Sequence, residues 1–265
     1  MPSKYLTWDD DCALRYLHAG PTTPPDVLPG WDRGAPIVFV HGEGGNAAHF
    51  LPQIEFFGQD HSPMALDLVG HGRSTGLSGP GGIDAAADML LDALGRLRLP
   101  PAVLVGHGAG GHIVLRAATV DPAAARAVVT LGTGWESEWP AAEATKLEDV
   151  VDGRTGQFFD TPFFAPETSP ETRRAFWGAL VQTDPRVRLE DIRDYQSSRL
   201  EDRLPPRDLP TRVLRGASDA LCSTESAEKL ATAMGSAVTE VPGAGHVPQL
   251  ENPQAVQQAI LEVCG

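Results

Sequence analysis

The sequence predicts an α/β fold with a mostly parallel, doubly wound sheet, and three observations support this. Short apolar runs rich in β-branched residues alternate with segments whose apolar residues recur at helical spacing, which is the pattern of βαβ units. Glycine-rich turns follow the apolar runs, at the strand ends where such sheets hold their sites. The chain has 265 residues, which fits one α/β domain with an inserted lid or two small domains, and its hydrophobic content of 42% is enough for a buried core.

The predicted elements follow a simple order along the chain. Residues 20–35 are rich in Pro, Gly and Asp and are predicted to form a surface loop. Short β-rich runs predict strands at 36–40, 64–68, 103–105, 127–131, 211–215 and 237–241. Apolar residues at helical spacing predict a helix over 83–99 and a closing helix over 253–263.

Residues 135–205 interrupt this alternation, because they concentrate aromatic residues and several prolines. We interpret them as a helical lid, inserted into a core that consists of residues 1–134 and 206–265. Two or three of the lid aromatics are expected to face a ligand, and the others to hold the lid to the core. The candidates for the pocket wall are Trp135, Trp139, Phe158, Phe163 and Trp177.

Composition excludes several classes of function. The net charge of −14 and the pI near 4.9 argue against a nucleic-acid partner and disfavour an anionic membrane face. The first residues lack the basic start and apolar core of a secretory leader, and no apolar run approaches the roughly 20 residues of a membrane helix. Three separated cysteines suggest neither a zinc site nor a disulfide framework, so we expect a cytoplasmic protein.

Five motifs in a fixed order carry a resemblance to a known family. One predicted strand ends in His41-Gly42, and the next leads into a D-x-x-G-x-G-x-S turn over 67–74. The turn at 106–110 has the spacing of a nucleophile elbow, G-x-S-x-G, with Gly108 at the serine position. A G-x-x-D turn ends at Asp219, and a G-x-G-H loop ends at His246. Together these motifs resemble the α/β-hydrolase fold superfamily over nearly the full length of the chain.

The resemblance implies a role for each of these positions. His246 is the general base, and Asp219 accepts the other imidazole N–H and fixes its tautomer. The backbone N–H groups of Glu43 and Ala109 form the oxyanion hole. Gly108 marks the vacant position of the nucleophile. The substrate pocket is expected to include His41, Gly42 and His107.

Two readings of the Glu43 side chain stay open. A carboxylate at the pocket rim can act as a second acid or base, with a pKa raised by apolar neighbours, or it can simply point to solvent. The histidines at 49, 107 and 112 are interpreted as structural. Ser218, Cys222 and Ser223 lie near Asp219 but not on the elbow, so none of them is expected to replace the missing serine.

Three explanations account for the glycine at position 108. A serine was replaced, which leaves the fold intact because glycine adopts the strained elbow conformation without steric cost. Alternatively, glycine is native, and His246 activates a water or deprotonates the substrate in a reaction without a nucleophile. The third explanation is a non-catalytic binder of small molecules, although the presence of both Asp219 and His246 counts against it.

A rival interpretation of the same turn is a dinucleotide-binding fingerprint. Residues 106–111 satisfy G-x-G-x-x-G between a strand and a helix. The next predicted strand, however, has no acidic residue at its tip, and at least two predicted strands precede the turn, whereas the fingerprint usually opens the first βα unit. A nicotinamide or flavin role is therefore not favoured.

The resulting prediction is an enzyme of the α/β-hydrolase type that acts on a small, fairly apolar carbonyl compound, such as an ester or a lactone. No metal and no organic cofactor is implied, and the only expected partner is a small-molecule substrate. The runner-up is a cofactor-free lyase, isomerase or decarboxylase that uses His246 as its base. The sequence does not indicate an oligomeric state.

Overall fold

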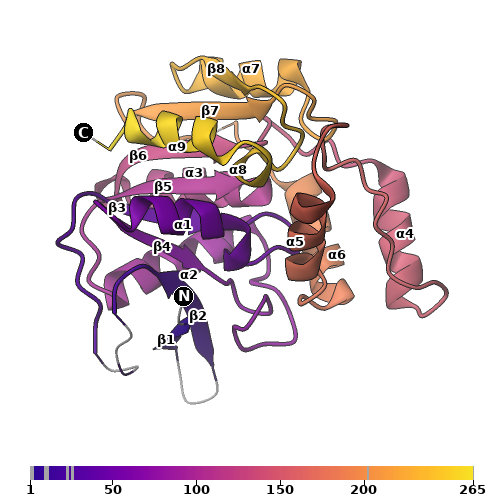
Figure 1. Ribbon diagram of the computed structural model, residues 1–265, viewed down its shortest axis with the longest axis horizontal. Helices are drawn as coiled ribbons and strands as arrows, with labels where there is room; N and C mark the ends of the chain where they lie inside the picture. Colours follow the sequence, from indigo (N-terminus) through magenta and orange to yellow (C-terminus); the bar gives the residue numbers. More distant parts are fainter. Residues whose placement is uncertain (1–2, 9–11, 22–23, 25–26, 202, 265) are drawn as a thin grey trace.

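The computed structural model describes residues 3–8, 12–21, 24, 27–201 and 203–264, and within them one eight-stranded sheet forms the centre of the protein (Figure 1). The strand order is β1-β2-β4-β3-β5-β6-β7-β8. The pairs from β4 to β8 are parallel, and only β1 and β2 pair antiparallel with their neighbours. The prediction of a mostly parallel α/β fold is therefore confirmed.

The strands are short and the helices follow them in alternation. The strands are β1 Ser3–Thr7, β2 Ala13–His18, β3 Pro36–Val40, β4 Ser62–Leu66, β5 Ala102–His107, β6 Ala125–Leu131, β7 Thr211–Gly216 and β8 Val238–Val241. The α-helices are α1 Leu51–Phe57, α2 Ile83–Arg96, α3 Ala109–Val120, α4 Ala141–Val151, α5 Pro170–Leu180, α6 Pro185–Ser197, α7 Thr224–Ala233, α8 Pro248–Glu251 and α9 Pro253–Leu261. Short 3-10 turns lie at Ala47–Phe50 and Pro122–Ala124.

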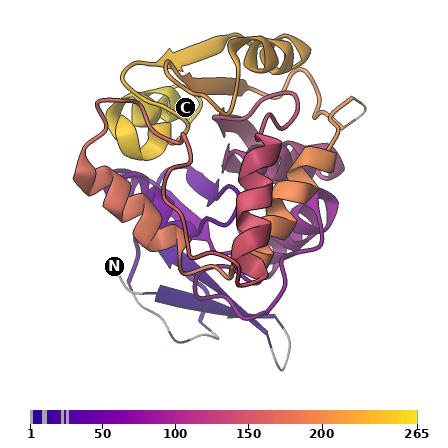
Figure 2. The ribbon, with the colours of Figure 1, turned by 90° about the vertical axis from the view of Figure 1, so that its right-hand side faces the viewer.

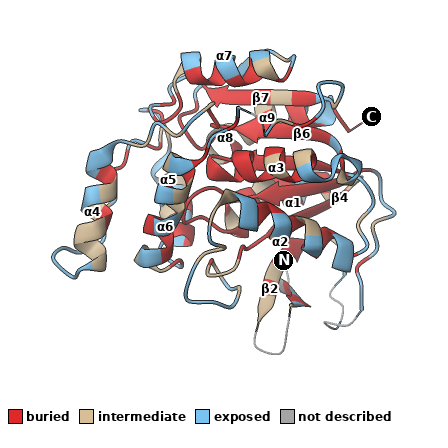
Figure 3. Cartoon of the chain, turned by 180° about the vertical axis from the view of Figure 1, so that it is seen from behind, coloured by how far each residue is buried: buried red, intermediate tan, exposed pale blue. Residues whose placement is uncertain are grey.

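The sheet is apolar on both faces because helices cover both. Along β3, Val38 and Val40 pack into the core beneath α2, α3 and α7, whereas Ile37 and Phe39 pack on the opposite side beneath α1 and α9. Figures 1 and 3 show these two helical layers from the front and from behind. Burial on both faces explains why the parallel strands are continuous apolar runs rather than alternating ones.

The first two strands and three of the core helices were not predicted. In β1, Lys4 and Leu6 are buried while Tyr5 is exposed, so this edge strand alternates and lacks the continuous apolar run that marks the central strands. The helices α1, α7 and α8 are short, which leaves few turns for a periodic pattern. The described residues of the predicted loop 20–35 contain no helix or strand, and residues 22–23 and 25–26 lie outside the description.

Between β6 and β7 the chain forms the three helices α4, α5 and α6, which lie beyond the carboxyl ends of the strands. Figure 2 shows α4 and α6 side by side, with α5 apart from them. We keep 135–205 as our proposed bounds of the lid. Within the described part of the chain, no helix has the length and apolar character needed to span a membrane.

Candidate active site

A sharp turn joins β5 to α3 and presents Gly108 at the helix start. Gly108 has φ 51° and ψ −122°, and its N–H donates to the Leu131 carbonyl at 3.0 Å. A Cβ on Gly106 would lie 2.1 Å from the Gly110 carbonyl oxygen, and one on Gly110 would lie 2.4 Å from the Val40 carbonyl oxygen. Only glycine at these flanking positions allows the helix to approach the sheet so closely. The turn therefore has the tight geometry that the sequence predicted for an elbow.

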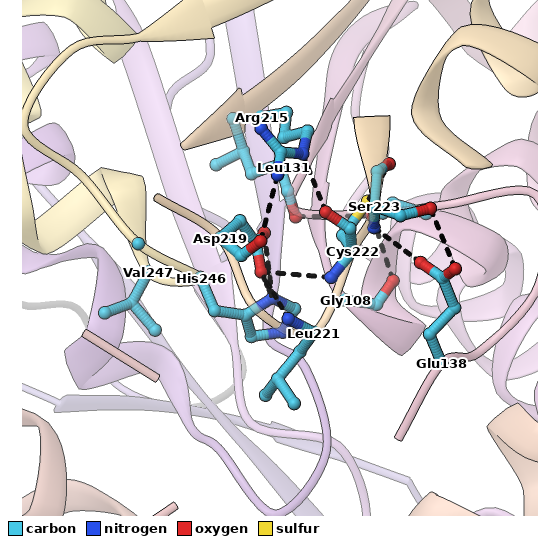
Figure 4. Close-up of polar contacts among 12 residues, drawn as sticks. Gly108, Leu131, Glu138, Arg215, Asp219, Leu221, Cys222, Ser223, His246 and Val247 are labelled. Carbon is cyan, nitrogen blue, oxygen red and sulfur yellow. Dashed lines mark hydrogen bonds and ion pairs between the residues drawn. The ribbon is translucent and has the colours of Figure 1, made fainter. Parts of the chain in front are cut away.

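The structure brings Asp219 and His246 together, although 26 residues separate them in the chain. His246 Nδ1 lies 3.1 Å from each carboxylate oxygen of Asp219 (Figure 4). Asp219 Oδ1 also accepts hydrogen bonds from the backbone N–H groups of Leu221 and Cys222, at 2.8 and 3.0 Å. These donors hold the carboxylate in place, so that it can orient the imidazole and stabilise its protonated form.

Two further charged residues brace the loops that carry this pair. Arg215 donates to the backbone carbonyls of Asp219 and Cys222, at 2.9 and 2.7 Å, and so supports the turn after β7. Glu251 Oε2 accepts from the backbone N–H groups of Gly245 and Val247, on either side of His246, at 2.8 and 3.2 Å. The loops that carry Asp219 and His246 are therefore held in place by the side chains of Arg215 and Glu251 as well as by their own backbone hydrogen bonds.

His246 has the electrostatics of a general base. Its ring is buried, which by itself lowers the pKa, but the charge and hydrogen bond of Asp219, with Glu43 and Glu251, raise the pKa of His246 above its ordinary value of 6.5. Its Nε2 atom is buried and has no hydrogen-bond partner. An unpaired buried nitrogen is unfavourable, and this one is the atom that a catalytic imidazole uses for proton transfer.

The Glu43 side chain occupies the space that a serine side chain would take on the elbow. A Cβ placed on Gly108 would lie 2.5 Å from Glu43 Oε2. The carboxyl group accepts a hydrogen bond from Trp139 Nε1 at 3.1 Å, and the backbone N–H groups of Glu43 and Ala109 stabilise its charged form. These two backbone groups are the predicted oxyanion donors. The Glu43 side chain is buried, so of the two readings left open by the sequence, exposure to solvent is wrong.

Burial dominates the ionisation of Glu43. It raises the pKa of the carboxyl above 4.5, while His246 and the backbone donors of Glu43 and Ala109 oppose this rise and the charge of Asp191 adds to it. Glu43 and His246 thus form two titratable groups whose charges act on each other. Such a pair on either side of a reacting centre is typical of acid–base chemistry.

A small cavity lies beside the predicted oxyanion donors, and α6 forms part of its wall. His41, Gly42, Glu43 and Ala109 line one part of it, and Leu68, Ile83 and Ile113 form an apolar wall. Asp191 and Asp194 of α6 add two more carboxyl groups. Its volume of about 20 Å³ is room for about one water molecule, so we infer that the lid helices move when a substrate enters.

The structure brings only some of the predicted pocket residues to this cavity. His41 and Gly42 border it, whereas His107 lies behind them and its Nε2 is 2.8 Å from the His246 carbonyl. Trp139 reaches the site through its contact with Glu43, and the ring centre of Phe163 lies 5.9 Å from that of His246.

The other three predicted pocket aromatics lie away from the cavity. Trp135 packs against the core near α7, with Lys229 Nζ 4.8 Å from its ring centre. Phe158 packs between α4 and α6. Trp177 packs against Phe163 and lines a shallow depression on the outer surface of α5. The prediction that these three residues line the pocket is therefore wrong for this cavity, because their rings are used in packing instead.

The histidines at 49 and 112 and two side chains near Asp219 contact groups outside the cavity. The rings of His49 and His112 are buried and contact the Phe176 carbonyl and the Ser198 hydroxyl, at 3.2 and 2.8 Å. The Ser223 hydroxyl donates to Glu138 at 2.8 Å, and burial raises the pKa of the Cys222 thiol. Neither group is available as a nucleophile. Among the described residues, no three His, Cys, Asp or Glu side chains are grouped so that they would hold a metal ion.

Sequence reasoning missed Glu251, Arg215 and Asp191. Glu251 stands five residues after His246, and a carboxylate so close in sequence to the predicted base was a usable signal. Asp191 offered none, because it belongs to α6, more than a hundred residues from its partners. Its Oδ2 accepts from Gly44 N at 2.8 Å and lies 2.7 Å from His71 Nε2, so it ties the lid to the oxyanion loop.

The contact between Asp191 and His71 predicts a pH-dependent stability. Burial lowers the pKa of His71, but the charge and hydrogen bond of Asp191 together raise it above 6.5. A raised histidine pKa means that this stabilisation is fully present below about pH 6.5, the unfolded value, and is lost as the pH rises through the folded pKa. Asp191→Asn is therefore expected to lower the melting temperature more at pH 6 than at pH 9.

The measurement is a thermal melt at both pH values, with exposed Asp208→Asn as the matched control. The control variant is expected to melt with the wild type at either pH. An equal loss in Asp191→Asn at pH 6 and pH 9 would contradict a contribution from protonated His71.

Comparison with known proteins places the chain in a family. The model of the alpha/beta hydrolase family matches residues 37–259. The chain belongs to the alpha/beta hydrolase family. It is 24% identical over 258 residues to 3-oxoadipate enol-lactonase 2 of Acinetobacter baylyi, which covers 94% of this chain and 92% of that protein. It is also similar to a thermophilic esterase from Thermogutta terrifontis, with a TM-score of 0.80, 23% identity, and coverage of 99% of this chain and 97% of that one.

Other relatives align over only part of their length. The chain is 31% identical over 111 residues to (E)-2-((N-methylformamido)methylene)succinate hydrolase of Acinetobacter baylyi, and this match spans 42% of either protein. A match to the acetyltransferase component of an acetoin cleaving system of Pseudomonas putida spans 64% of that protein. The structural likenesses establish the fold, while activity and substrate have to be argued from the site.

Proposed function

We propose that this α/β-hydrolase-like enzyme hydrolyses a small, fairly apolar ester or lactone without a covalent serine intermediate. His246, oriented by Asp219, takes a proton from water as the water attacks the substrate carbonyl. The names of the relatives, which include an esterase and an enol-lactonase, are consistent with this class of substrate. No cofactor takes part in the proposed reaction.

The main support for this proposal is that the Glu43 carboxyl occupies the space next to Gly108. The acid–base pair is assembled and buried, but the nucleophile position has no side chain, and the Glu43 carboxyl lies where one would be. A serine fits at position 108 only if the carboxyl end of the Glu43 side chain moves away. This complementarity favours a native glycine over a recent loss of serine, and the retained base favours an enzyme over a passive binder.

The charges around the cavity favour uncharged substrates. Asp191 and Asp194 line it, and none of the described residues that border it is a lysine or arginine. Burial lowers the pKa of His41 well below 6.5, so this ring adds no positive charge at neutral pH. Carboxylates in a site of low dielectric repel an anionic substrate. This chain is therefore proposed to differ from its relatives whose names contain succinate or oxoadipate.

A matched pair of substrates tests this specificity. A neutral alkyl ester is expected to have a kcat/KM at least about tenfold above that of an ester of the same length that ends in a carboxylate, because a repulsion of about 1.4 kcal/mol has this effect. Asp194→Asn removes one of the negative charges, so it is expected to bring the kcat/KM values of the two esters closer together. Equal rates for the two esters, or preference for the anion, would contradict the assignment of substrate charge.

The reaction itself is tested by turnover on a panel of esters and lactones. The expected result is turnover by the wild type with no initial burst and no labelling of any side chain by a serine-reactive phosphonate. Turnover should disappear in His246→Ala. A burst of product or a labelled side chain would mean that a covalent intermediate forms and would contradict the proposed mechanism.

A second candidate function is supported by the same carboxyl group. The Glu43 carboxyl lies at the two predicted oxyanion donors, the backbone N–H groups of Glu43 and Ala109. From this place Glu43 can exchange a proton with one atom of a substrate while His246 exchanges a proton with another. Such a pair suits a lyase or an isomerase that forms an enol. Exchange of substrate protons with heavy water, without hydrolysis, would favour this function over the first.

A further inference from the structure

We propose that the Glu43 side chain is a catalytic residue: its carboxyl group fills the oxyanion hole and donates a proton to the substrate carbonyl oxygen, while His246 accepts a proton from the attacking water. This inference rests on the nucleophile-free reaction proposed above. In the mechanism that the sequence predicted, two backbone N–H groups bind the substrate oxygen directly. In the mechanism proposed here, these groups bind the Glu43 carboxyl, and the carboxyl binds the substrate oxygen.

The contacts of Glu43 define where its proton can go. The Trp139 indole N–H donates to Glu43 Oε1 at 3.1 Å, and the backbone N–H groups of Glu43 and Ala109 are near enough to act on the charge of the carboxyl. These groups are donors, so none of them can accept the O–H of the protonated form, which is left to be donated elsewhere. Since the group borders the cavity, the substrate carbonyl is the acceptor that can meet this O–H.

The surroundings of Glu43 favour the neutral acid over a nucleophilic carboxylate. The side chain is buried, and the nearby apolar wall contains Leu68, Ile83 and Ile113. The charge of Asp191 on α6 further disfavours a second anion at this place, while His246 acts in the opposite direction. A carboxylic acid kept neutral in an apolar site can donate a strong hydrogen bond to a developing oxyanion.

The protons and electrons balance over one cycle. His246 Nε2 takes a proton from water while the water oxygen bonds to the carbonyl carbon, and the carbonyl oxygen takes the proton of Glu43. Glu43 then takes this proton back as the carbonyl re-forms and the bond to the leaving oxygen breaks. Protonated His246 gives its proton to that oxygen, so the products are an acid and an alcohol, and both residues return to their starting state.

The pH dependence of hydrolysis separates this role from a structural one. The wild type needs a neutral His246 and a protonated Glu43, so kcat/KM is expected to follow a bell-shaped curve. Glu43→Gln keeps a neutral N–H donor but has no proton to lose. It is expected to reduce the optimal kcat/KM about tenfold, the worth of one weakened hydrogen bond, and to abolish the fall at alkaline pH. Glu43→Leu removes the donor and is expected to reduce kcat/KM by on the order of a hundredfold.

Trp139→Phe provides a graded test of the same group. The indole N–H stabilises the charged carboxylate, so its removal is expected to raise the pKa of Glu43 and to move the alkaline limb to higher pH. Exposed Glu136→Gln, on the same segment as Trp139, is the matched control and should keep the wild-type profile. An unchanged alkaline limb in both Glu43→Gln and Trp139→Phe would overturn the role of Glu43.

A spectroscopic measurement makes the test independent of turnover. Infrared difference spectra of wild type against Glu43→Gln are expected to show a carboxylic-acid band that titrates above the ordinary glutamate pKa of about 4.3. A band that titrates at or below that value overturns the proposal, as does incorporation of heavy oxygen into Glu43 during a single turnover in labelled water.

The two proposals fail differently. If His246→Ala abolishes hydrolysis while the Glu43 variants keep the wild-type rate and profile, the general-base reaction holds and the role of Glu43 is refuted. If His246→Ala remains as active as the wild type, the proposed function itself is refuted.

Discussion

Replacement of Gly108 by serine alone is expected to give no active serine hydrolase. The new Cβ would lie 2.5 Å from Glu43 Oε2, so either the carboxyl or the turn must move. At φ 51° a residue other than glycine also carries strain of about 1–3 kcal/mol. The Gly108→Ser variant is therefore expected to melt at a lower temperature than the wild type and to react poorly with a serine-directed phosphonate.

The double variant Gly108→Ser/Glu43→Ala is expected to behave differently. Removal of the carboxyl leaves space for the serine side chain and frees the backbone N–H groups of Glu43 and Ala109. A serine that His246 can deprotonate then faces an open oxyanion hole, which is worth about 10²–10³-fold in rate for each donor. Labelling of residue 108, measured by intact mass, should be at least about a hundredfold faster than in the single variant.

The comparison of single and double variants measures the coupling of the two positions. Glu43→Ala without the serine is the control, and it should show no labelling at position 108. Fast labelling of Gly108→Ser with Glu43 in place would show that the carboxyl moves away freely. That result would show that a serine at position 108 is compatible with Glu43, and would contradict the proposal that glycine is the native residue.

Loss of the base is expected to have the largest effect on the wild-type reaction. His246→Ala should reduce kcat/KM by about 10²–10⁴-fold, the usual contribution of general acid–base catalysis. The pKa of His246 is raised above 6.5, mainly because Asp219 outweighs the effect of burial. Only the neutral ring accepts a proton, so the activity that depends on it should rise with pH through a midpoint above 6.5.

Asp219→Asn tests the origin of that midpoint. Without the carboxylate charge the protonated imidazole is less stable, so the pKa of His246 falls and the acid limb of the profile moves to lower pH. The rate at the optimum also falls, since an amide no longer fixes the correct tautomer. His61→Gln, a histidine near the opposite end of the sheet, is the matched control and should leave rate and profile unchanged. An acid limb that stays in place in Asp219→Asn would refute the assignment of His246 as the titrating base.

Much of the scaffold was predictable from local patterns. The central strands are continuous apolar runs because both of their faces are buried, and the glycines at 106 and 110 mark a turn where backbone atoms approach too closely for any side chain. The order of the motifs also predicted the pairing of Asp219 with His246. The strands β1 and β2 were missed because a run of five or six residues that includes polar ones gives a weak signal.

The interior of the site was not predictable in the same way. Residues at 43, 108 and 139 converge from three separate segments, and no spacing in the chain indicates that a carboxyl meets an indole above a glycine. The predicted pocket aromatics show the same limit, since Trp139 reaches the site while Trp135, four residues away, packs against the core. The direction in which an aromatic side chain points is set by how the lid helices pack, and the sequence does not reveal it.

The sequence by itself determined the fold class, the pairing of Asp219 with His246, and the absence of a side chain at position 108, because these follow from local periodicity and from motifs whose residues are close together. Only the tertiary structure decided that the Glu43 carboxyl lies beside Gly108 and that Asp191 of α6 bonds to the loop that carries Glu43. Both of these depend on contacts between segments distant in the chain, and such contacts are set by how the helices pack over the ends of the strands.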